Sequence, residues 1–363
     1  MSKDLWTYLA LSSKVKVVYG MGNGADKILG ICEQYGIEIA DFFASDGFVR
    51  GHSFHGKVVL SYSEAKAKYG AENMIVLLSF ASSLPDVLAN IYRIADECEL
   101  YAPDVPVSGD NIFNAEFFEG NKDKIDAVRE LLADEKSREV YDSVISYKLT
   151  GDVKYLRHSH SDMSEAYTDI LHAESFEQIA DLGAYNGDTL REIKPYATRI
   201  KEAIAFEPDA RTFKKLSAYA EGEDFKINCL NLAAWSGEET LFFDGGGSRN
   251  SNLLKSDSLE VGKAAKVVEV KANSLDNILG GERIDYIKFD VEGAEKEAII
   301  GAEKTIKVYK PALAVSVYHR SEDIFELALQ IHKICPEYKF YMRRRKYIPA
   351  WDTLLFAICG RHK

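Results

Sequence analysis

The distribution of apolar and polar residues along the chain predicts two α/β units. Short apolar runs, each ended by glycine or polar residues, alternate with segments whose apolar residues recur every three to four positions. This alternation covers residues 1–105 and again 176–363, and the more polar stretch 106–175 has helical periodicity only. Alternating strands and helices favour parallel sheets with helices on both faces. We therefore predict two Rossmann-like, doubly wound domains joined by a helical connector.

The first domain has the pattern of half a dinucleotide-binding fold. Strands are expected at 16–19, 37–43, 54–60 and 74–80, and helices at 25–35, 63–69 and 85–98. A glycine loop, Gly20 to Gly24, follows the first strand, and Asp46 follows the second at the spacing of an acid that binds ribose. The glycines fit only G-x-G-x-x-A. A site for a nucleotide, NAD or a nucleotide-sugar therefore stands beside a second interpretation, a degenerate domain used for docking or for a homodimer.

The connector is predicted to contain helices at 121–132 and 137–149. Its segment Arg157-His-Ser-His-Ser-Asp162 places two histidines two residues apart. No strand is predicted there to point both the same way, and no further metal ligand is in register. We expect a loop that borders the second domain's cleft, where Tyr155, His158 or His160 can contact a substrate.

The second domain is predicted to be richer in strands. They are expected near 179–182 and at 202–206, 225–230, 240–243, 266–271, 285–289, 312–317, 339–342 and 354–358, with helices from 188, at 294–308 and at 324–335. The insertion 244–252 is interpreted either as a substrate loop or as a plain hairpin loop. The basic run Arg343 to Lys346 is expected to be a solvated turn, with a substrate phosphate site as the alternative.

One glycine turn in this domain suits a cationic ligand. The sequence reads Asp181-x-Gly183-x-x-x-Gly187-Asp188, which differs from the phosphate-binding G-x-G-x-x-G. Carboxylates on both sides of the turn suit an ammonium group, and S-adenosylmethionine (SAM) carries one and has no phosphate. A glycine-rich turn in an ordinary α/β domain is the alternative.

The ends of the following strands add further candidates. Glu207-Pro208 ends the next strand, where a carboxylate can accept hydrogen bonds from both ribose hydroxyls, unless Glu207 merely caps the helix. Asn231 and Ala233 follow the third strand, where an adenine edge can lie. Strand alternation points Lys288 and Asp290 to one side. Three candidates are expected at the carboxyl edge of the sheet, where ligands bind in α/β proteins: Asp290, Glu292 and His319.

Composition excludes several classes of protein. A net charge of −12 over 363 residues argues against a nucleic-acid binder. The five cysteines form no C-x-x-C pair or Cys/His cluster, so neither zinc nor a disulfide framework is expected. No leader-like segment and no apolar run long enough to span a bilayer is found, so a cytoplasmic protein without an integral membrane segment is expected.

These motifs together identify a resemblance. The Asp181–Asp188 turn, Glu207-Pro208 and the run Lys288-Phe-Asp-Val-Glu-Gly-Ala-Glu295 resemble those of the FkbM-family SAM-dependent methyltransferases. The resemblance covers roughly 176–320 and leaves out the first domain. It implies a seven-stranded sheet with an antiparallel last strand, SAM as methyl donor, and methylation of hydroxyls on sugars or natural products.

We therefore expect an O-methyltransferase acting on a sugar or glycan intermediate, either a small molecule or a lipid- or nucleotide-linked sugar. Asp290 is the first candidate for a base or a metal ligand, followed by Glu292 and His319, with Lys288 beside them. Mg²⁺ is a candidate cofactor, although no ligand set is complete in the sequence. An NAD(P)-dependent sugar oxidoreductase or epimerase is disfavoured, because no Tyr-x-x-x-Lys pair follows the first glycine loop. A non-enzymatic nucleotide-binding scaffold is the third alternative.

Overall fold

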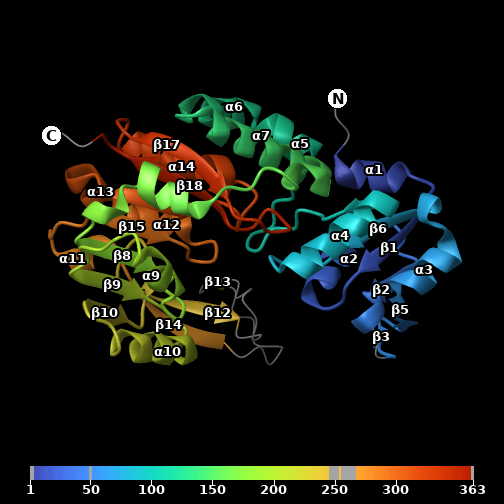
Figure 1. Ribbon diagram of the computed structural model, residues 1–363, viewed down its shortest axis with the longest axis horizontal. Helices are drawn as coiled ribbons and strands as arrows, with labels where there is room; N and C mark the ends of the chain where they lie inside the picture. Colours follow the sequence, from blue (N-terminus) through green and yellow to red (C-terminus); the bar gives the residue numbers. More distant parts are fainter. Residues whose placement is uncertain (1–3, 49–50, 245–252, 255–266, 361–363) are drawn as a thin grey trace.

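The computed structural model describes residues 4–48, 51–244, 253–254 and 267–360. It contains two α/β units, the first on the right in Figure 1 and the second on the left, with helices of the connector along the top. None of the described helices is long and apolar enough to cross a membrane.

The first unit is a five-stranded parallel sheet. Its strands are β1 (Val15–Tyr19), β2 (Asp41–Ala44), β5 (Leu60–Ser61), β6 (Met74–Leu78) and β7 (Glu99–Tyr101), in the order β5-β2-β1-β6-β7. Its helices are α1 (Leu5–Leu11), α2 (Asn23–Gln34), α3 (Tyr62–Tyr69) and α4 (Pro85–Glu97). Two short strands, β3 (Ser53–Phe54) and β4 (Lys57–Val58), form a separate antiparallel pair. The order is that of a Rossmann fold.

Local sequence explains where these elements begin. A capping box between Ser61 and Glu64 starts α3, and Pro85 occupies the first turn of α4. The strand predicted at 37–43 starts only at Asp41, whereas α1 and β7 were not predicted.

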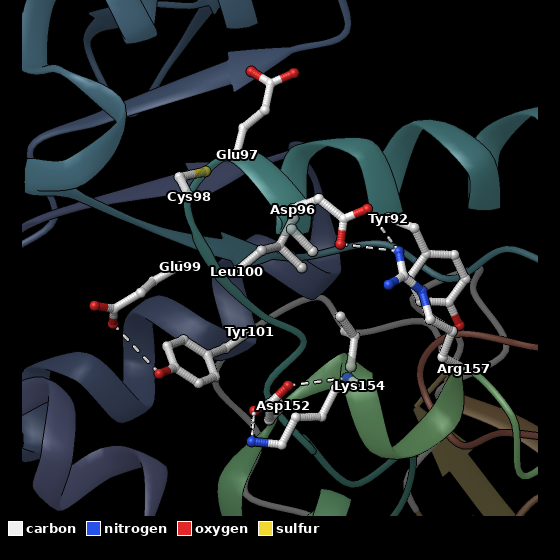
Figure 2. A pocket seen from close by; sticks show the side chains of 12 residues that line it. Tyr92, Asp96, Glu97, Cys98, Glu99, Leu100, Tyr101, Asp152, Lys154 and Arg157 are labelled. Atoms are coloured by element: carbon white, nitrogen blue, oxygen red, sulfur yellow. Dashed lines mark hydrogen bonds and ion pairs between the residues drawn. The ribbon is translucent and has the colours of Figure 1, made fainter.

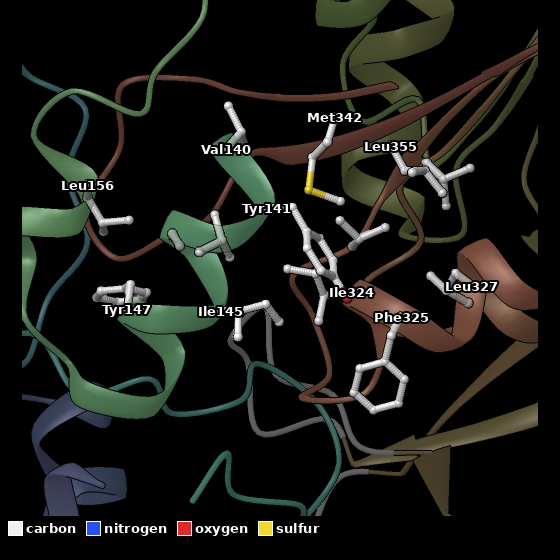
Figure 3. Close-up of a cluster of buried hydrophobic side chains, with 14 of the residues drawn as sticks. Val140, Tyr141, Ile145, Tyr147, Leu156, Ile324, Phe325, Leu327, Met342 and Leu355 are labelled. Carbon is white, nitrogen blue, oxygen red and sulfur yellow. The ribbon is translucent and has the colours of Figure 1, made fainter. Parts of the chain in front are cut away.

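The connector packs against the second unit. It comprises α5 (Ala115–Gly120), α6 (Lys122–Leu131), α7 (Glu135–Thr150) and short turns η3 (Val153–Leu156), α8 (Met163–Glu165), η4 (Ala166–Ile170) and η5 (Ala173–Ser175). Figure 3 shows Val140 and Tyr141 of α7 in one cluster of buried side chains with Ile324 and Met342 of the C-terminal unit. Asp134 caps the start of α7, and Gly151, in the left-handed conformation, ends it.

The second unit is built on a seven-stranded sheet. Its strands are β8 (Gln178–Leu182), β9 (Glu202–Phe206), β10 (Lys226–Leu230), β15 (Tyr286–Phe289), β16 (Ala312–Ser316), β17 (Lys339–Arg344) and β18 (Thr353–Ile358), in the order β10-β9-β8-β15-β16-β18-β17. The first five of that order are parallel, and β18 is antiparallel to both neighbours. The predicted antiparallel last strand is therefore confirmed.

Helices and a small second sheet complete this unit. The helices are α9 (Asp188–Ile193), α10 (Ala210–Ala220), α11 (Leu275–Leu279), α12 (Glu295–Ile300), α13 (Glu303–Tyr309) and α14 (Asp323–Ile334). The single helix predicted at 294–308 is thus two helices separated at Gly301, where an added Cβ would lie 1.9 Å from the Trp235 carbonyl oxygen. The small sheet contains β11 (Ala233–Ala234), β12 (Glu239–Asp244), β13 (Leu253–Leu254) and β14 (Val267–Asn273). Apart from Asp244, the predicted loop 244–252 lies outside the described residues.

The solvated turn predicted at 343–346 was wrong for its first two residues. Arg343 and Arg344 are the last residues of β17 and are 1% and 0% exposed. Arg343 is buried because its guanidinium pairs with Asp134 and Glu165 of the connector. Lys346 alone of the four is fully exposed.

Candidate active site

The carboxyl ends of the parallel strands gather most of the predicted residues. Asp181 near the end of β8 lies beside Lys288 of β15 in the parallel register. The Lys288 Nζ is 3.6 Å from Asp181 Oδ1 and 3.2 Å from Asp290 Oδ2. Lys288 therefore links the end of β8 to the loop that follows β15.

The glycine turn after β8 is held by close backbone contacts. A Cβ on Gly183 would lie 1.9 Å from the Asp290 carbonyl oxygen, and the residue has φ +87°. Only glycine fits both conditions. A Cβ on Gly187 would lie 2.3 Å from the Tyr219 ring. Tyr185 between them has φ +47°, a strained conformation of the kind that clusters at functional sites.

Asp181 is a buried carboxylate with unused hydrogen-bonding capacity. The residue is 1% exposed, and neither side-chain oxygen accepts a hydrogen bond from the described part of the chain. Burial raises its pKa to about 6, although Lys288 opposes the shift. A ligand ammonium group would satisfy these oxygens, so the residue fits the amino-acid end of SAM.

Glu207 ends β9 and is 7% exposed. Its Oε1 accepts a hydrogen bond from the Asp209 amide at 2.8 Å. Burial raises the pKa of Glu207 to about 7, even though the amides of Asp209 and Tyr185 favour its ionised form. Asp209, not Glu207, caps α10 by accepting from the Thr212 amide.

The other residues predicted to contact SAM lie in three different places. Asn231 donates from Nδ2 to the carbonyl oxygens of Glu207 and Pro208, so it fixes the loop beside the carboxylate. Asp188 begins α9 and its Oδ1 accepts from the Thr189 amide. Ala233 lies in the small sheet, where it pairs with Ala272 of β14.

Asp290 is an accessible carboxylate in a ring of charged groups. Its side chain is 27% exposed, whereas that of Asp181 is 2% exposed. Burial would raise the pKa of Asp290, but the charges of Lys288 and His319 outweigh it and lower the pKa. The Tyr318 hydroxyl donates to Asp290 Oδ1 at 3.4 Å. Asp290 is therefore an ionised hydrogen-bond acceptor at neutral pH.

Three carboxylates lie near the ring nitrogens of His319. Its Nδ1 lies 2.9 Å from Glu295 Oε1, and its Nε2 lies 3.7 Å from Asp290 Oδ1 and 3.6 Å from Glu292 Oε2. Burial would lower its pKa, but Glu295 and the other carboxylates raise it to about 10. His319 is thus an imidazolium at neutral pH. Glu292 is more exposed, at 55% of its side chain, and has φ +56°.

Sequence reasoning did not single out Glu295. It is 0% exposed, and its Oε1 also accepts from the Val291 amide at 2.8 Å. Its position at the end of the Lys288–Glu295 run was the available signal. Donor atoms of Asp290, Glu295 and His319 lie within 4.8 Å of one another, which makes this one of two groups of possible metal ligands among the described residues.

The connector covers one side of the site, which the sequence did not predict. The Ser108 amide donates to the His319 carbonyl oxygen at 2.9 Å. A Cβ on Gly293 would lie 2.6 Å from the Ser108 side chain, and Arg320 donates from Nε to the Gly293 carbonyl oxygen. Lys27 of α2 holds the same segment through the carbonyl oxygens of Pro106 and Val107.

Two features of the N-terminal half lie apart from this edge. The carboxylate of Asp46 accepts from the amide and hydroxyl of Ser63, so it anchors the start of α3. A pocket of about 430 Å³ lies between α4, β7 and η3 (Figure 2). Among its charged side chains, Asp96 pairs with Arg157 and Asp152 pairs with Lys154.

Comparisons with known proteins agree with this architecture. Residues 181–348 match the family model described as the methyltransferase FkbM domain. The crystal structure of methyltransferase FkbM from Methylobacillus flagellatus KT is similar, with a TM-score of 0.71, 18% identity, and coverage of 95% of this chain and 90% of that one. The similarity extends over the first unit, which the sequence resemblance left out.

Two further solved structures are less similar. An rRNA methylase from Streptococcus thermophilus has a TM-score of 0.33, 14% identity, and coverage of 55% of this chain and 95% of that one. Aeropyrum pernix fibrillarin, in complex with S-adenosyl-L-methionine, has a TM-score of 0.33, 10% identity, and coverage of 52% and 69%. A comparison with curated proteins gave no match. Residues 181–348 thus match the methyltransferase FkbM domain, and the described fold is similar to that of a methyltransferase of this name.

Proposed function

We propose that this protein is a SAM-dependent O-methyltransferase that acts on a sugar hydroxyl. The observation that carries the proposal is the pair of buried carboxylates, Asp181 and Glu207, at the ends of adjacent strands in a methyltransferase domain. Neither oxygen of Asp181 has a hydrogen-bond partner among the described residues, so both can accept from an ammonium group, and Glu207 can accept from ribose hydroxyls. SAM supplies a methyl group on an activated sulfonium.

Positioning of the two reactants is the main contribution that the protein makes to methyl transfer. Displacement at the methyl carbon needs the acceptor oxygen in line with the departing sulfur, and orientation supplies much of the rate. We assign Asp290 to the acceptor hydroxyl, because it is ionised and accessible. A carboxylate of low pKa suffices as base, since the hydroxyl becomes strongly acidic only as its oxygen gains the methyl group.

The remaining charged residues then hold this carboxylate. Lys288 contacts Asp181 and Asp290, and so ties the donor site to the acceptor site. His319, paired with Glu295, supports Asp290 and Glu292 as a cation and not as a base. The carboxylate oxygens of Asp290 and Glu295 would suit Mg²⁺, but an imidazolium offers no lone pair to a metal. Lys288 and His319 already supply positive charge beside Asp290.

The sugar class of the acceptor rests on the family resemblance. The test is methyl incorporation from labelled SAM into a panel of free, nucleotide-linked and lipid-linked sugars. We expect incorporation into at least one, with kcat lost in Asp290→Asn and SAM binding lost in Asp181→Ala. Incorporation only into protein or nucleic acid would refute the assignment of the acceptor.

A further inference from the structure

Two basic sequence motifs meet in the fold at a place the proposed chemistry does not use. Arg344 at the end of β17 donates from Nη2 to the Leu156 carbonyl oxygen at 2.6 Å and to Ser159 Oγ at 3.3 Å. Its carbonyl oxygen accepts from the Ser161 amide at 2.7 Å, and its Nη1 donates to the Tyr347 carbonyl oxygen. The segment 156–161 is therefore wrapped around Arg344, next to the loop that follows β17.

Arg344 has no counter-ion among the described residues. It is 0% exposed, its acceptors are carbonyl and hydroxyl oxygens, and its Nε has no partner in that part of the chain. Its two neighbours differ, since Arg343 pairs with Asp134 and Arg345 with Glu192. Burial lowers the pKa of Arg344 to about 10, which leaves it charged at neutral pH. A buried, unpaired cation is costly and favours a nearby anion.

Exposed basic residues flank the contacts of this buried charge: two histidines lie on either side of Ser159, and Lys346 follows two residues after Arg344. His158, His160 and Lys346 are all exposed, and none forms an ion pair with a carboxylate of the described residues. Hydrogen bonds with Arg344 hold the segment 156–161, which carries both histidines, against the end of β17, two residues before Lys346. After the effect of burial, the charges of Arg344 and Lys346 lower the pKa of His160. Such a group is unexpected in a chain of net charge −12.

The group borders the methyl-transfer site. Arg345, which precedes Lys346, donates from its amide to the Asp352 carbonyl oxygen at 3.1 Å. The next residue, Thr353, accepts a hydrogen bond from the Val317 amide at 3.1 Å. Val317 precedes Tyr318, whose hydroxyl donates to Asp290. The loop that follows β17 carries the rings of Tyr347 and Trp351, 6.0 Å apart, and aromatic rings of this kind can pack against a sugar or a base.

We propose that His158, His160 and Lys346 form a phosphate subsite of the acceptor, above the buried guanidinium of Arg344. The acceptor is then a sugar that bears a phosphate, with its hydroxyl at Asp290 and its phosphate on the basic group. This assignment rests on the proposed methyl transfer to a sugar. It gives a role to the two histidines and to the basic run that the sequence analysis left open.

The first test is calorimetric titration of pyrophosphate into the full-length protein at low salt. Lys346→Ala should weaken binding about tenfold, as expected for losing a charge-assisted contact. The double variant His158→Ala/His160→Ala should weaken it by a similar factor, because two hydrogen-bond donors are lost. Lys214→Ala is the matched control, because Lys214 is equally exposed but lies on α10. Equal pyrophosphate affinity in the wild type, the control and both variants would overturn the subsite.

A second titration separates this inference from the proposed function. SAM should bind Lys346→Ala as tightly as it binds the wild type; loss of SAM binding in that variant would contradict a role confined to the phosphate. If the wild type binds pyrophosphate but not SAM, the methyltransferase proposal fails and the anion site stands. Methyl incorporation into a nucleoside-diphosphate sugar and into a prenyl-phosphate sugar then identifies the source of the phosphate. Incorporation only into sugars without phosphate would refute the acceptor assignment.

Discussion

The affinity for SAM should depend on pH through Glu207. With a pKa of about 7, this carboxyl is about one-tenth ionised at pH 6 and about nine-tenths ionised at pH 8. Ribose hydroxyls donate hydrogen bonds, so they favour the ionised carboxylate. Because the competent form rises about tenfold, the association constant should rise about tenfold, or about 1.4 kcal/mol. Asp181, with a pKa of about 6, should add about a factor of two.

The assay is calorimetric titration of SAM at pH 6 and pH 8 into the wild type and Glu207→Gln. The amide keeps an acceptor oxygen but does not titrate, so only the roughly twofold dependence from Asp181 should remain. Glu221→Gln is the control, because Glu221 is exposed at the end of α10. A tenfold pH dependence that survives in Glu207→Gln, or is absent from the wild type, would refute this reasoning.

Four further outcomes are expected. Gly183→Ala should lower the free energy of unfolding by about 2–4 kcal/mol in urea, because its Cβ would meet the Asp290 carbonyl at a positive φ; Gly237→Ala, in open space, should change it by less than about 0.5 kcal/mol. Asp290→Asn should lower kcat about 10²–10⁴-fold and leave the Kd for SAM within about twofold, and an equal loss in both would contradict its assignment to the acceptor. Glu295→Gln should bring the pKa of His319 down toward neutrality, because burial then dominates, and should place a new inflection between pH 7 and 9 in the pH–rate profile; an unchanged profile would speak against the ion pair. EDTA should leave turnover unchanged, whereas activity restored only by Mg²⁺ would show that the cations of the protein do not suffice.

Much of the fold was predictable because local signals and tertiary packing agree. Apolar runs such as the strand at 74–78 are fully buried, and the spacing of Asp181, Glu207 and Asp290 follows strand ends that a parallel sheet brings to one edge. The short edge strand β7 was missed because three residues carry little periodicity.

The errors around the site and in the basic run have a common physical cause, which is contact between segments that are distant in the chain. Arg343 and Arg344 look solvated in the sequence, yet contacts with the connector, distant in the chain, bury both. In the sequence, Glu295 has the pattern of a residue on a helix surface. Only the fold places its carboxylate against His319. The contact of Ser108 with the His319 loop joins segments about 200 residues apart, which no local pattern can predict.

The most direct test of the central claim is a crystal structure of the full-length protein with S-adenosylhomocysteine. We expect the ribose hydroxyls on Glu207 and the ammonium group within hydrogen-bond distance of Asp181, with the sulfur facing Asp290. A ligand bound instead at the Gly20–Gly24 loop, or no ligand at millimolar concentration, would contradict it.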